Sequence, residues 1–191
     1  MSIRLVLAAA VVTPLLMPAA DAGTVPVGAF KQVALHGGGH IVLKHGATQS
    51  VSLIAGSTDV TSFTIQDGTE LVIDTCGNTV VMCPVHYDLD IEITSPDIQG
   101  VSIHGGGEIA TEGAFPAQNN LAVDIHGGGE IDVRGIDARD VAAAVHDGGG
   151  IKLTATHSLV ASIHGGGDIT FRGHPSLVES IHGGGDIDSE D

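Results

Sequence analysis

The stretch IHGGGDIT at residues 163–170 is one copy of a motif that recurs along the chain and decides its fold. Each copy places a histidine before a glycine triplet or an Asp-Gly-Gly-Gly run, and an isoleucine closes it. The copies begin at His36, His104, His126, His146, His164 and His182. From the second copy onward the steps are 22, 20, 18 and 18 residues. A period near 20 residues is typical of coils that stack on one another.

Within each copy, aliphatic and polar residues alternate with the period of two that is expected for a β-strand. Ile163 and Ile169 should therefore face the interior, while His164 and Asp168 face outward. The equivalent aliphatic residues should form two internal ladders: Ile103, Ile125, Val145, Ile163 and Ile181, and Ile109, Ile131, Ile151, Ile169 and Ile187. Each buried side chain contributes roughly 1.5–3 kcal/mol, against about 1–2 kcal/mol of backbone entropy per ordered residue. A single coil would not be stable alone, so stability requires stacking.

Residues 27–97 lack strict repeats, but they contain short runs rich in β-branched residues, separated by Gly, Asn and Asp. No long segment has helical periodicity. We therefore predict an all-β protein. It should be a single-stranded parallel β-helix, or solenoid, with repeat coils at residues 98–191 and an irregular β-rich portion at residues 27–97. Because no Pro- or Ser-rich linker separates the two parts, residues 23–191 should form one domain.

Residues 1–22 have the features of a secretory signal peptide. Arg4 is the charged start, residues 5–12 are apolar, and Ala20–Ala22 forms a small-residue cleavage site. Prolines interrupt the apolar stretch, which falls short of the ~20 residues that a transmembrane helix needs. We expect an exported protein without a membrane span, located in the periplasm, at the cell surface or outside the cell.

The amino-acid composition restricts the kinds of partner that this protein can bind. The chain has 7 basic and 23 acidic residues, a formal net charge of −16. Such a surface repels nucleic acid, anionic lipid and polyuronates, and it favours cations and basic partners. Tryptophan is absent and Tyr87 is the only tyrosine, which argues against a binding platform built from aromatic side chains.

The chain contains two cysteines, Cys76 and Cys83. Export to an oxidising compartment favours a disulfide between them. The loop that it would close is short, so the stabilisation should reach roughly 2–3 kcal/mol at most. A redox pair or thiolate metal site is the less favoured alternative, because the sequence has no CxxC motif.

Several segments together resemble the head GIN domain family, described as "putative auto-transporter adhesins". The resemblance rests on Phe30 to Gly38, DGTELVID at 67–74, LDIEITSPDIQGVSIHGGG at 89–107 and the later HGGGDI units. It implies a β-helical body, an envelope or secreted location and no established enzymatic activity. Family repeats commonly carry a small polar residue where this chain has histidine.

Stacked coils would place equivalent side chains about 4.8 Å apart and so form outward-facing columns. One column would contain His104, His126, His146, His164 and His182. A second would contain Glu108, Glu130, Asp168 and Asp186, interrupted by Gly150. Ser102, Asp124, Ser162 and Ser180 lie two residues before a histidine, on the same outer face. Stacked carboxylates repel one another and attract a cation.

Neutral imidazoles bind Zn²⁺, Cu²⁺ and Ni²⁺, and a neighbouring carboxylate can complete or orient such a site. The candidate metal ligands are His36, His40, His104, His126, His146, His164, His182, Glu108, Glu130, Asp168 and Asp186. Weaker Ca²⁺ binding at the acidic column is a further hypothesis. The alternatives are a solvated ladder, in which the rings stack over the glycine corner, and a pH-sensitive surface, because histidine titrates near 6.5.

We expect an exported, non-enzymatic, adhesin-like protein that presents a repetitive histidine and acidic face to an unknown surface or envelope partner. The first alternative is a divalent-metal-binding protein. The second is a carbohydrate-active enzyme that uses the carboxylates of Asp88, Asp90 and Glu92. HGGG also occurs in the oxyanion hole of some lipases, but this chain lacks both their G-x-S-x-G elbow and their α/β pattern.

Overall fold

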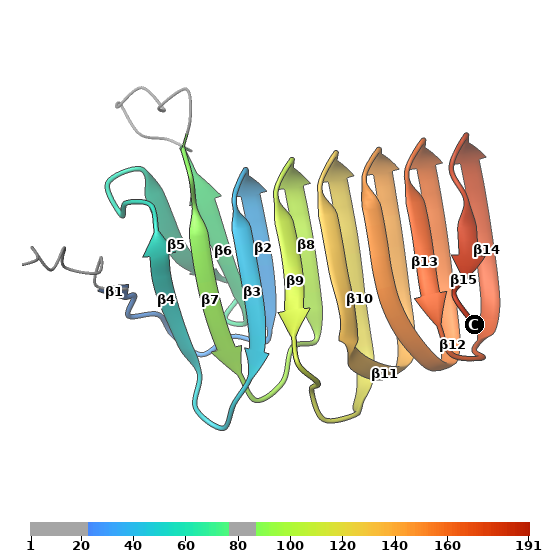
Figure 1. Ribbon diagram of the computed structural model, residues 1–191, viewed down its shortest axis with the longest axis horizontal. Coiled ribbons are helices and arrows are strands. Elements are labelled where there is room, and N and C mark those ends of the chain that lie inside the picture. Colours follow the sequence, from blue (N-terminus) through green and yellow to red (C-terminus); the bar gives the residue numbers. More distant parts are fainter. Residues whose placement is uncertain (1–22, 77–86) are drawn as a thin grey trace, which may run out of the picture.

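The computed structural model describes residues 23–76 and 87–191 (Figure 1). Within these ranges the secondary structure is all β, and fifteen strands form one sheet. Across the same ranges no helix has the length and hydropathy needed to cross a membrane. The predicted signal peptide at residues 1–22 lies outside the described residues.

The strands divide into an N-terminal group and the group that carries the later repeats. The first group is β1 Gly23–Thr24, β2 Gln32–Gly37, β3 His40–His45, β4 Ser50–Ala55, β5 Thr61–Gln66, β6 Glu70–Thr75 and β7 Asp90–Ser95. The second is β8 Gly100–Gly105, β9 Glu108–Glu112, β10 Gln118–Gly127, β11 Glu130–Asp147, β12 Gly150–Gly165, β13 Asp168–Arg172, β14 Ser176–Gly183 and β15 Ile187–Ser189.

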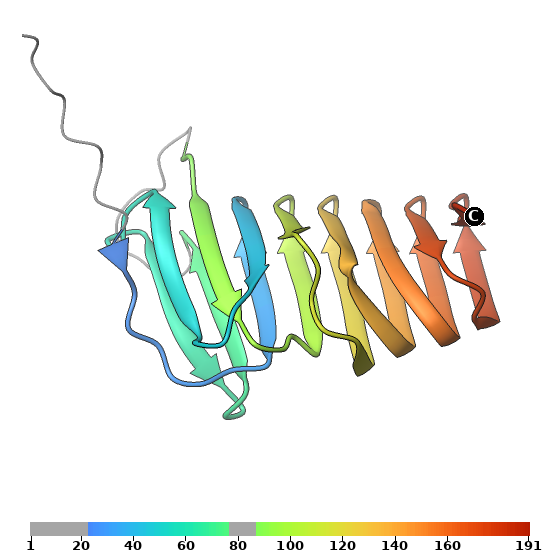
Figure 2. The ribbon, with the colours of Figure 1, turned by 60° about the horizontal axis from the view of Figure 1, so that its bottom comes forward.

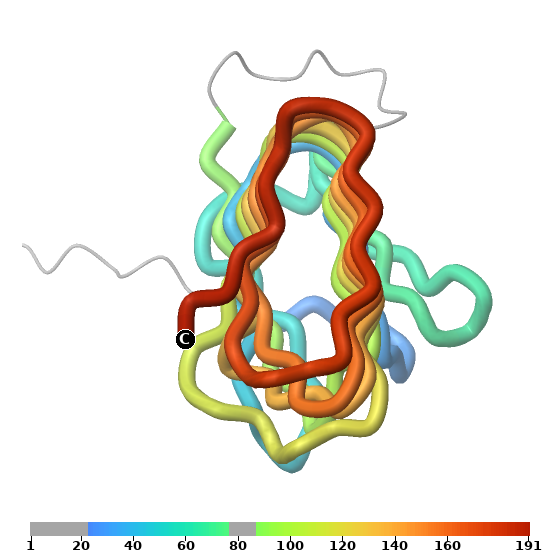
Figure 3. The backbone as a smooth tube through the Cα atoms, turned by 90° about the vertical axis from the view of Figure 1, so that its right-hand side faces the viewer, coloured from blue at the N-terminus to red at the C-terminus, as the bar shows by residue number. Residues whose placement is uncertain are grey.

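Successive turns of the chain lie over one another when the molecule is viewed along its long axis (Figure 3). The sheet therefore curls into two layers, with one row of strands in front of the other (Figure 2). We call the outward side of β2, β8, β10, β14 and the C-terminal halves of β11 and β12 the His face. The outward side of β3, β9, β13, β15 and the N-terminal halves of β11 and β12 is the acid face. Within both faces these strands pair in parallel.

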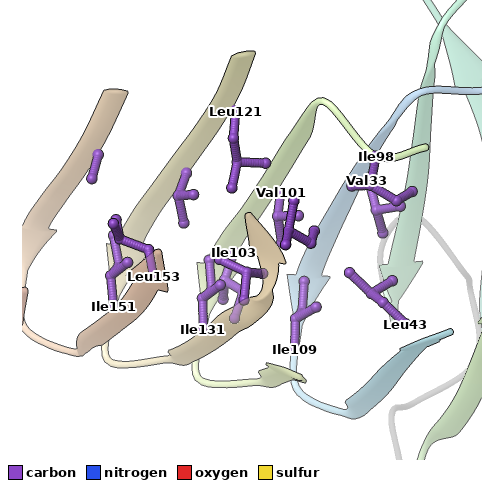
Figure 4. Packing of buried hydrophobic residues seen from close by; sticks show 14 of the residues in the cluster. Val33, Leu43, Ile98, Val101, Ile103, Ile109, Leu121, Ile131, Ile151 and Leu153 are labelled. Carbon is purple, nitrogen blue, oxygen red and sulfur yellow. The ribbon is translucent and has the colours of Figure 1, made fainter. Parts of the chain in front are cut away.

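The core lies between the two faces and contains the predicted ladders. Strand register places Ile103 beside Ile125 and Ile125 beside Val145, and all three are completely buried. On the opposite face Ile109, Ile131, Ile151 and Ile169 are likewise buried. Several of these side chains point into the space between the faces (Figure 4). Both ladders are confirmed except in the last turn, where Ile181 is 42% exposed and Ile187 is only partly buried.

The predicted single-stranded parallel β-helix is wrong, because the sheet is mixed. β1 pairs antiparallel with β4, β4 with β7, and β5 with β6. The β5–β6 hairpin has a local cause. Asp67 and Gly68 both have positive φ, at 48° and 75°, and the amide of Thr69 donates to the carbonyl of Gln66. An Asp-Gly pair in this conformation forms the tight turn that joins antiparallel strands.

The N-terminal portion continues the repeat stack. β2 pairs in parallel with β8, and its register aligns His36 with His104. β3 pairs in parallel with β9, which aligns His40 with Glu108. The first histidine motif therefore belongs to the same stack as the later ones, although 68 residues separate His36 from His104 (104 − 36).

Glycine occupies the corner that joins the two faces in every motif but the fourth. Gly105, Gly127, Gly165 and Gly183 have positive φ, and a Cβ added at Gly127 would lie 2.5 Å from the carbonyl oxygen of Gly105. Such a contact leaves no room for a side chain at Gly127 in its observed conformation. In the fourth motif Asp147 takes this position with φ of 79°, a conformation that aspartate tolerates better than most residues.

Candidate functional site

Six histidines form one continuous column along the edge of the His face. The register pairs each with the next: His36, His104, His126, His146, His164 and His182. From His104 onward the adjacent rings stack, with interplanar angles of 3° to 12° and centroids 4.3 to 5.4 Å apart. The ring of His36 instead meets His104 edge to face, at 4.7 Å and 70°. The predicted imidazole column is confirmed and extends one strand further than predicted.

The acidic column is also present, on the acid face. Glu108 aligns with His40 and Glu130, and Gly150 separates Glu130 from Asp168. The backbone N–H of Asp186 donates to the Asp168 carboxylate over 3.2 Å. Lys152 Nζ lies 2.6 Å from Glu130 Oε1, and so partly neutralises this column.

The glycine corner separates the two columns. A histidine and the acid four residues after it belong to different faces, so their side chains leave the sheet on different sides of the corner. Among the described residues, the ligand atoms of one group of His, Cys, Asp and Glu side chains converge: His104, Asp124 and His126, all within 4.8 Å of one another. The carboxylate that joins the imidazoles is thus Asp124, not a member of the acidic column.

Asp124 lies on β10, two residues before His126, so both side chains point outward from the same strand. Its Oδ1 is 2.6 Å from His126 Nδ1, and its Oδ2 is 3.8 Å from Nε2 of His146 on the next strand. The residues aligned with Asp124 on the two adjacent strands are Ser102 on β8 and Ala144 on β11, and both are small. Asp124 therefore lies between imidazoles of neighbouring strands with room to move.

The electrostatics of His104 favour the neutral ring. Partial burial is the main cause that lowers the pKa of His104, and the neighbouring imidazoles of His36 and His126 add to the effect. Asp124 and Glu70 oppose the shift but do not cancel it. A neutral ring has a free lone pair, which is the form that binds a metal.

A shallow hollow lies beside the histidine column on the His face. Its lining includes Ala122, Ala142, Ala144, Val160, Ser162 and Asp124. A second hollow shares Ala122, Ala142 and Val160 with the first and continues toward Asn120, Asp140 and Ser158. Small residues on three neighbouring strands create this depression, which has an apolar floor and polar side chains at both edges.

Two of the carboxylates considered for sugar cleavage, both on β7, contact basic side chains of β3. Asp90 Oδ1 lies 3.5 Å from His40 Nδ1, and Glu92 Oε2 lies 3.0 Å from Lys44 Nζ. His40 therefore faces Asp90 and Glu108, away from the histidine column.

Comparison with known proteins identifies the family of this chain. The family described as "Putative auto-transporter adhesin, head GIN domain" matches residues 29–152 and 116–175. The chain belongs to this family. The resemblance found in the sequence is thereby confirmed. No curated protein matches the chain.

Solved structures of similar proteins cover most of this GIN domain protein. A "putative adhesin" from Bacteroides fragilis has a TM-score of 0.52 at 19% identity, covering 88% of this chain and 95% of that chain. A "putative adhesin" from Parabacteroides merdae has a TM-score of 0.44 at 13% identity, with 90% and 96% covered. A "putative cell adhesion protein" from Clostridium sporogenes has a TM-score of 0.39 at 13% identity, with 88% and 98% covered. The first of these likenesses shows that the fold is shared.

One predicted feature of this GIN domain protein is only partly within the described residues. Cys76 follows β6 with a φ of 61°, whereas Cys83 lies in the segment outside them. The Cys76–Cys83 disulfide therefore stays a prediction.

Asp124 was not among the predicted ligands, although the sequence carries the signal for it. Strand alternation places the residue two before each histidine on the same outward face. Asp124 is the acid at that position, where Ser102, Ser162 and Ser180 stand in other turns. In the last turn Ser180 Oγ lies 3.4 Å from His182 Nδ1, so a side chain at this position reaches its histidine.

Proposed function

We propose that this GIN domain protein is an exported, non-enzymatic, adhesin-like binding protein whose His face contacts a partner at the cell surface or in the envelope. The proposal rests chiefly on the in-register His face, where small residues form a shallow hollow beside a column of stacked imidazoles. Family membership supports the adhesin-like role and the exported location.

The shape of this face suits a partner that is itself extended and regular. Residues of one kind recur on successive strands about 4.8 Å apart, so a repeating polymer could make the same contact several times. The row of Ala122, Ala142 and Val160 offers apolar contact. The imidazoles beside it can donate or accept hydrogen bonds. The net charge of −16 favours a neutral or basic partner.

A pair of matched variants tests which face binds. Ala142→Arg fills the hollow on the His face, whereas Thr170→Arg adds the same side chain on the acid face, where Thr170 aligns with Lys152. Purified protein would be applied to an array of neutral and basic glycans and to immobilised envelope fractions. We expect Ala142→Arg to reduce binding at least about tenfold (~1.4 kcal/mol) and Thr170→Arg to leave it unchanged.

Equal binding by both variants, or loss only with Thr170→Arg, would reject the His face as the contact surface. The enzymatic alternative is tested on the same glycans. Release of shortened products on incubation with the wild-type protein would show that the protein is a carbohydrate-active enzyme.

A further inference from the structure

We propose that His104, Asp124 and His126 form a binding site for one divalent transition-metal ion on the His face. This inference goes beyond the proposed binding function and is independent of it. It also narrows the set of eleven candidate ligands named from the sequence to three residues on two adjacent strands, β8 and β10.

The three ligand atoms lie nearly close enough together to coordinate one metal ion. They all lie within 4.8 Å of one another. Ligand atoms about 2.0–2.2 Å from a tetrahedral zinc ion are about 3.3 Å from each other. His104 and His126 are exposed, and Asp124 is flanked by small residues, so side-chain rotation can supply the remaining approach. The backbone does not have to move, because the parallel register already places both histidines side by side.

The donor set selects the class of metal. Two imidazole nitrogens and one carboxylate oxygen suit Zn²⁺, Cu²⁺ and Ni²⁺. Ca²⁺ takes six to eight oxygen ligands, which these three residues cannot supply. Three protein ligands also leave a coordination position for water or for a group from a partner.

The position of Asp124 explains why there should be one site and not a row of sites. The described residues aligned with Asp124 on the other histidine strands are Ala34, Ser102, Ala144, Ser162 and Ser180. None of them is a carboxylate. The acidic column cannot replace it, since Glu108 and Glu130 lie beyond the glycine corner on the acid face.

Removal of the carboxylate is the first test. The tag-free protein would be stripped with a chelator and titrated calorimetrically with ZnCl₂, NiCl₂, CuCl₂ and CaCl₂. We expect one Zn²⁺ per chain and no comparable Ca²⁺ binding. Asp124→Ser introduces the residue of the neighbouring turns, and His126→Asn removes an imidazole. Each should weaken Zn²⁺ binding at least about tenfold. His182→Asn, in the last turn, where Ser180 stands at the position of Asp124, should leave the affinity unchanged.

Addition of a carboxylate is the second test. Ser162 lies two residues before His164, with His146 on the preceding strand, as Asp124 lies before His126 with His104. Ser162→Asp should therefore raise the stoichiometry from one Zn²⁺ to two. Circular dichroism of each metal-free variant would establish that it is folded, and Cu²⁺ electron paramagnetic resonance would report nitrogen ligation.

Three outcomes would overturn the proposal. They are no Zn²⁺ binding below millimolar concentration by the wild-type protein, equal affinity of Asp124→Ser and wild type, and equal losses in His126→Asn and His182→Asn. None of them would affect the test of the proposed function when glycan and envelope binding is measured with the chelator-stripped protein.

Discussion

Arg134 and Glu190 are 56 residues apart in the sequence, yet Nη1 of the arginine lies 3.1 Å from Oε1 of the glutamate. Arg134 also donates to the carboxylate of Asp132, and Glu190 accepts from Nε of Arg172 over 2.6 Å. These four side chains connect β11, β13 and the residue that follows β15. They fix the last segment of the chain against turns that precede it.

Replacement of Arg134 by methionine should loosen this end of the stack. The substitution keeps the aliphatic stem but removes the donors to Asp132 and Glu190. A partly exposed network of ion pairs stabilises the fold only modestly, so the midpoint of thermal unfolding should fall by about 2–4 °C. Arg139→Met is the matched control, because Arg139 is more exposed and makes one long contact, 3.6 Å from Asp140. Equal midpoints for Arg134→Met and wild type would show that the network does not stabilise the fold.

The same network predicts how the stability of the fold depends on pH. Burial raises the pKa of Asp132, but hydrogen bonds from Arg134 outweigh it and the net pKa is lowered. The pKa of Glu190 is also lowered, because hydrogen bonds from Arg134 and Arg172 outweigh burial. Folded-state pKa values below the ordinary 3.8 and 4.5 mean that the unfolded chain binds protons first as pH falls.

The stabilisation should therefore be complete above about pH 5 and lost progressively below the ordinary pKa values. Thermal unfolding of wild type and Arg134→Met, measured from pH 7 to pH 2.5, should give curves that converge at the acid end. A difference in midpoint that stayed constant to pH 2.5 would contradict this assignment.

Substitution at the glycine corner should be costly at one position and tolerated at the next. Gly127→Ala places a methyl group 2.5 Å from the Gly105 carbonyl oxygen, in a residue whose φ is +122°. Backbone strain alone costs about 1–3 kcal/mol, so we expect unfolding at least about 4 °C lower. Gly128→Ala is the control, because a Cβ there has no neighbour within 4 Å. Similar midpoints for the two variants would mean that the corner is looser than its geometry indicates.

Glu179 should limit self-association through the last strand. It aligns with the buried Ala161, between Leu177 and Ile181, which are 37% and 42% exposed. An inward-pointing charge on an outer strand discourages pairing with another sheet edge. Glu179→Ala should therefore increase oligomer formation in sedimentation velocity at concentrations where wild type is monomeric. Ser180→Ala, outward on the same strand, is the control. Identical sedimentation of Glu179→Ala and Ser180→Ala would dismiss this role.

The local elements of this protein were predictable because each depends on neighbouring residues. The alternation of Ile163 and Ile169 with His164 and Asp168 predicts strands, an aliphatic interior and an outward histidine column. The glycine triplets predict a tight corner, and the close approach of Gly127 to the Gly105 carbonyl shows why glycine is favoured there. The Asp67–Gly68 pair also carries a hairpin signal, which repeat spacing alone did not reveal.

The repeat period determined, from sequence alone, which residues stack along each column, because a regular strand spacing repeats every contact. Strand alternation places Asp124 on the same outward side as His126, but only the tertiary structure showed that this carboxylate, and not the acidic column, meets the imidazoles. His104 and Glu108 are four residues apart, but the glycine corner sends their side chains to different faces. Asp124 is twenty residues from His104 (124 − 104) and belongs to another turn. Parallel pairing of β8 with β10 brings the two together, because hydrogen bonds between strands fix their register.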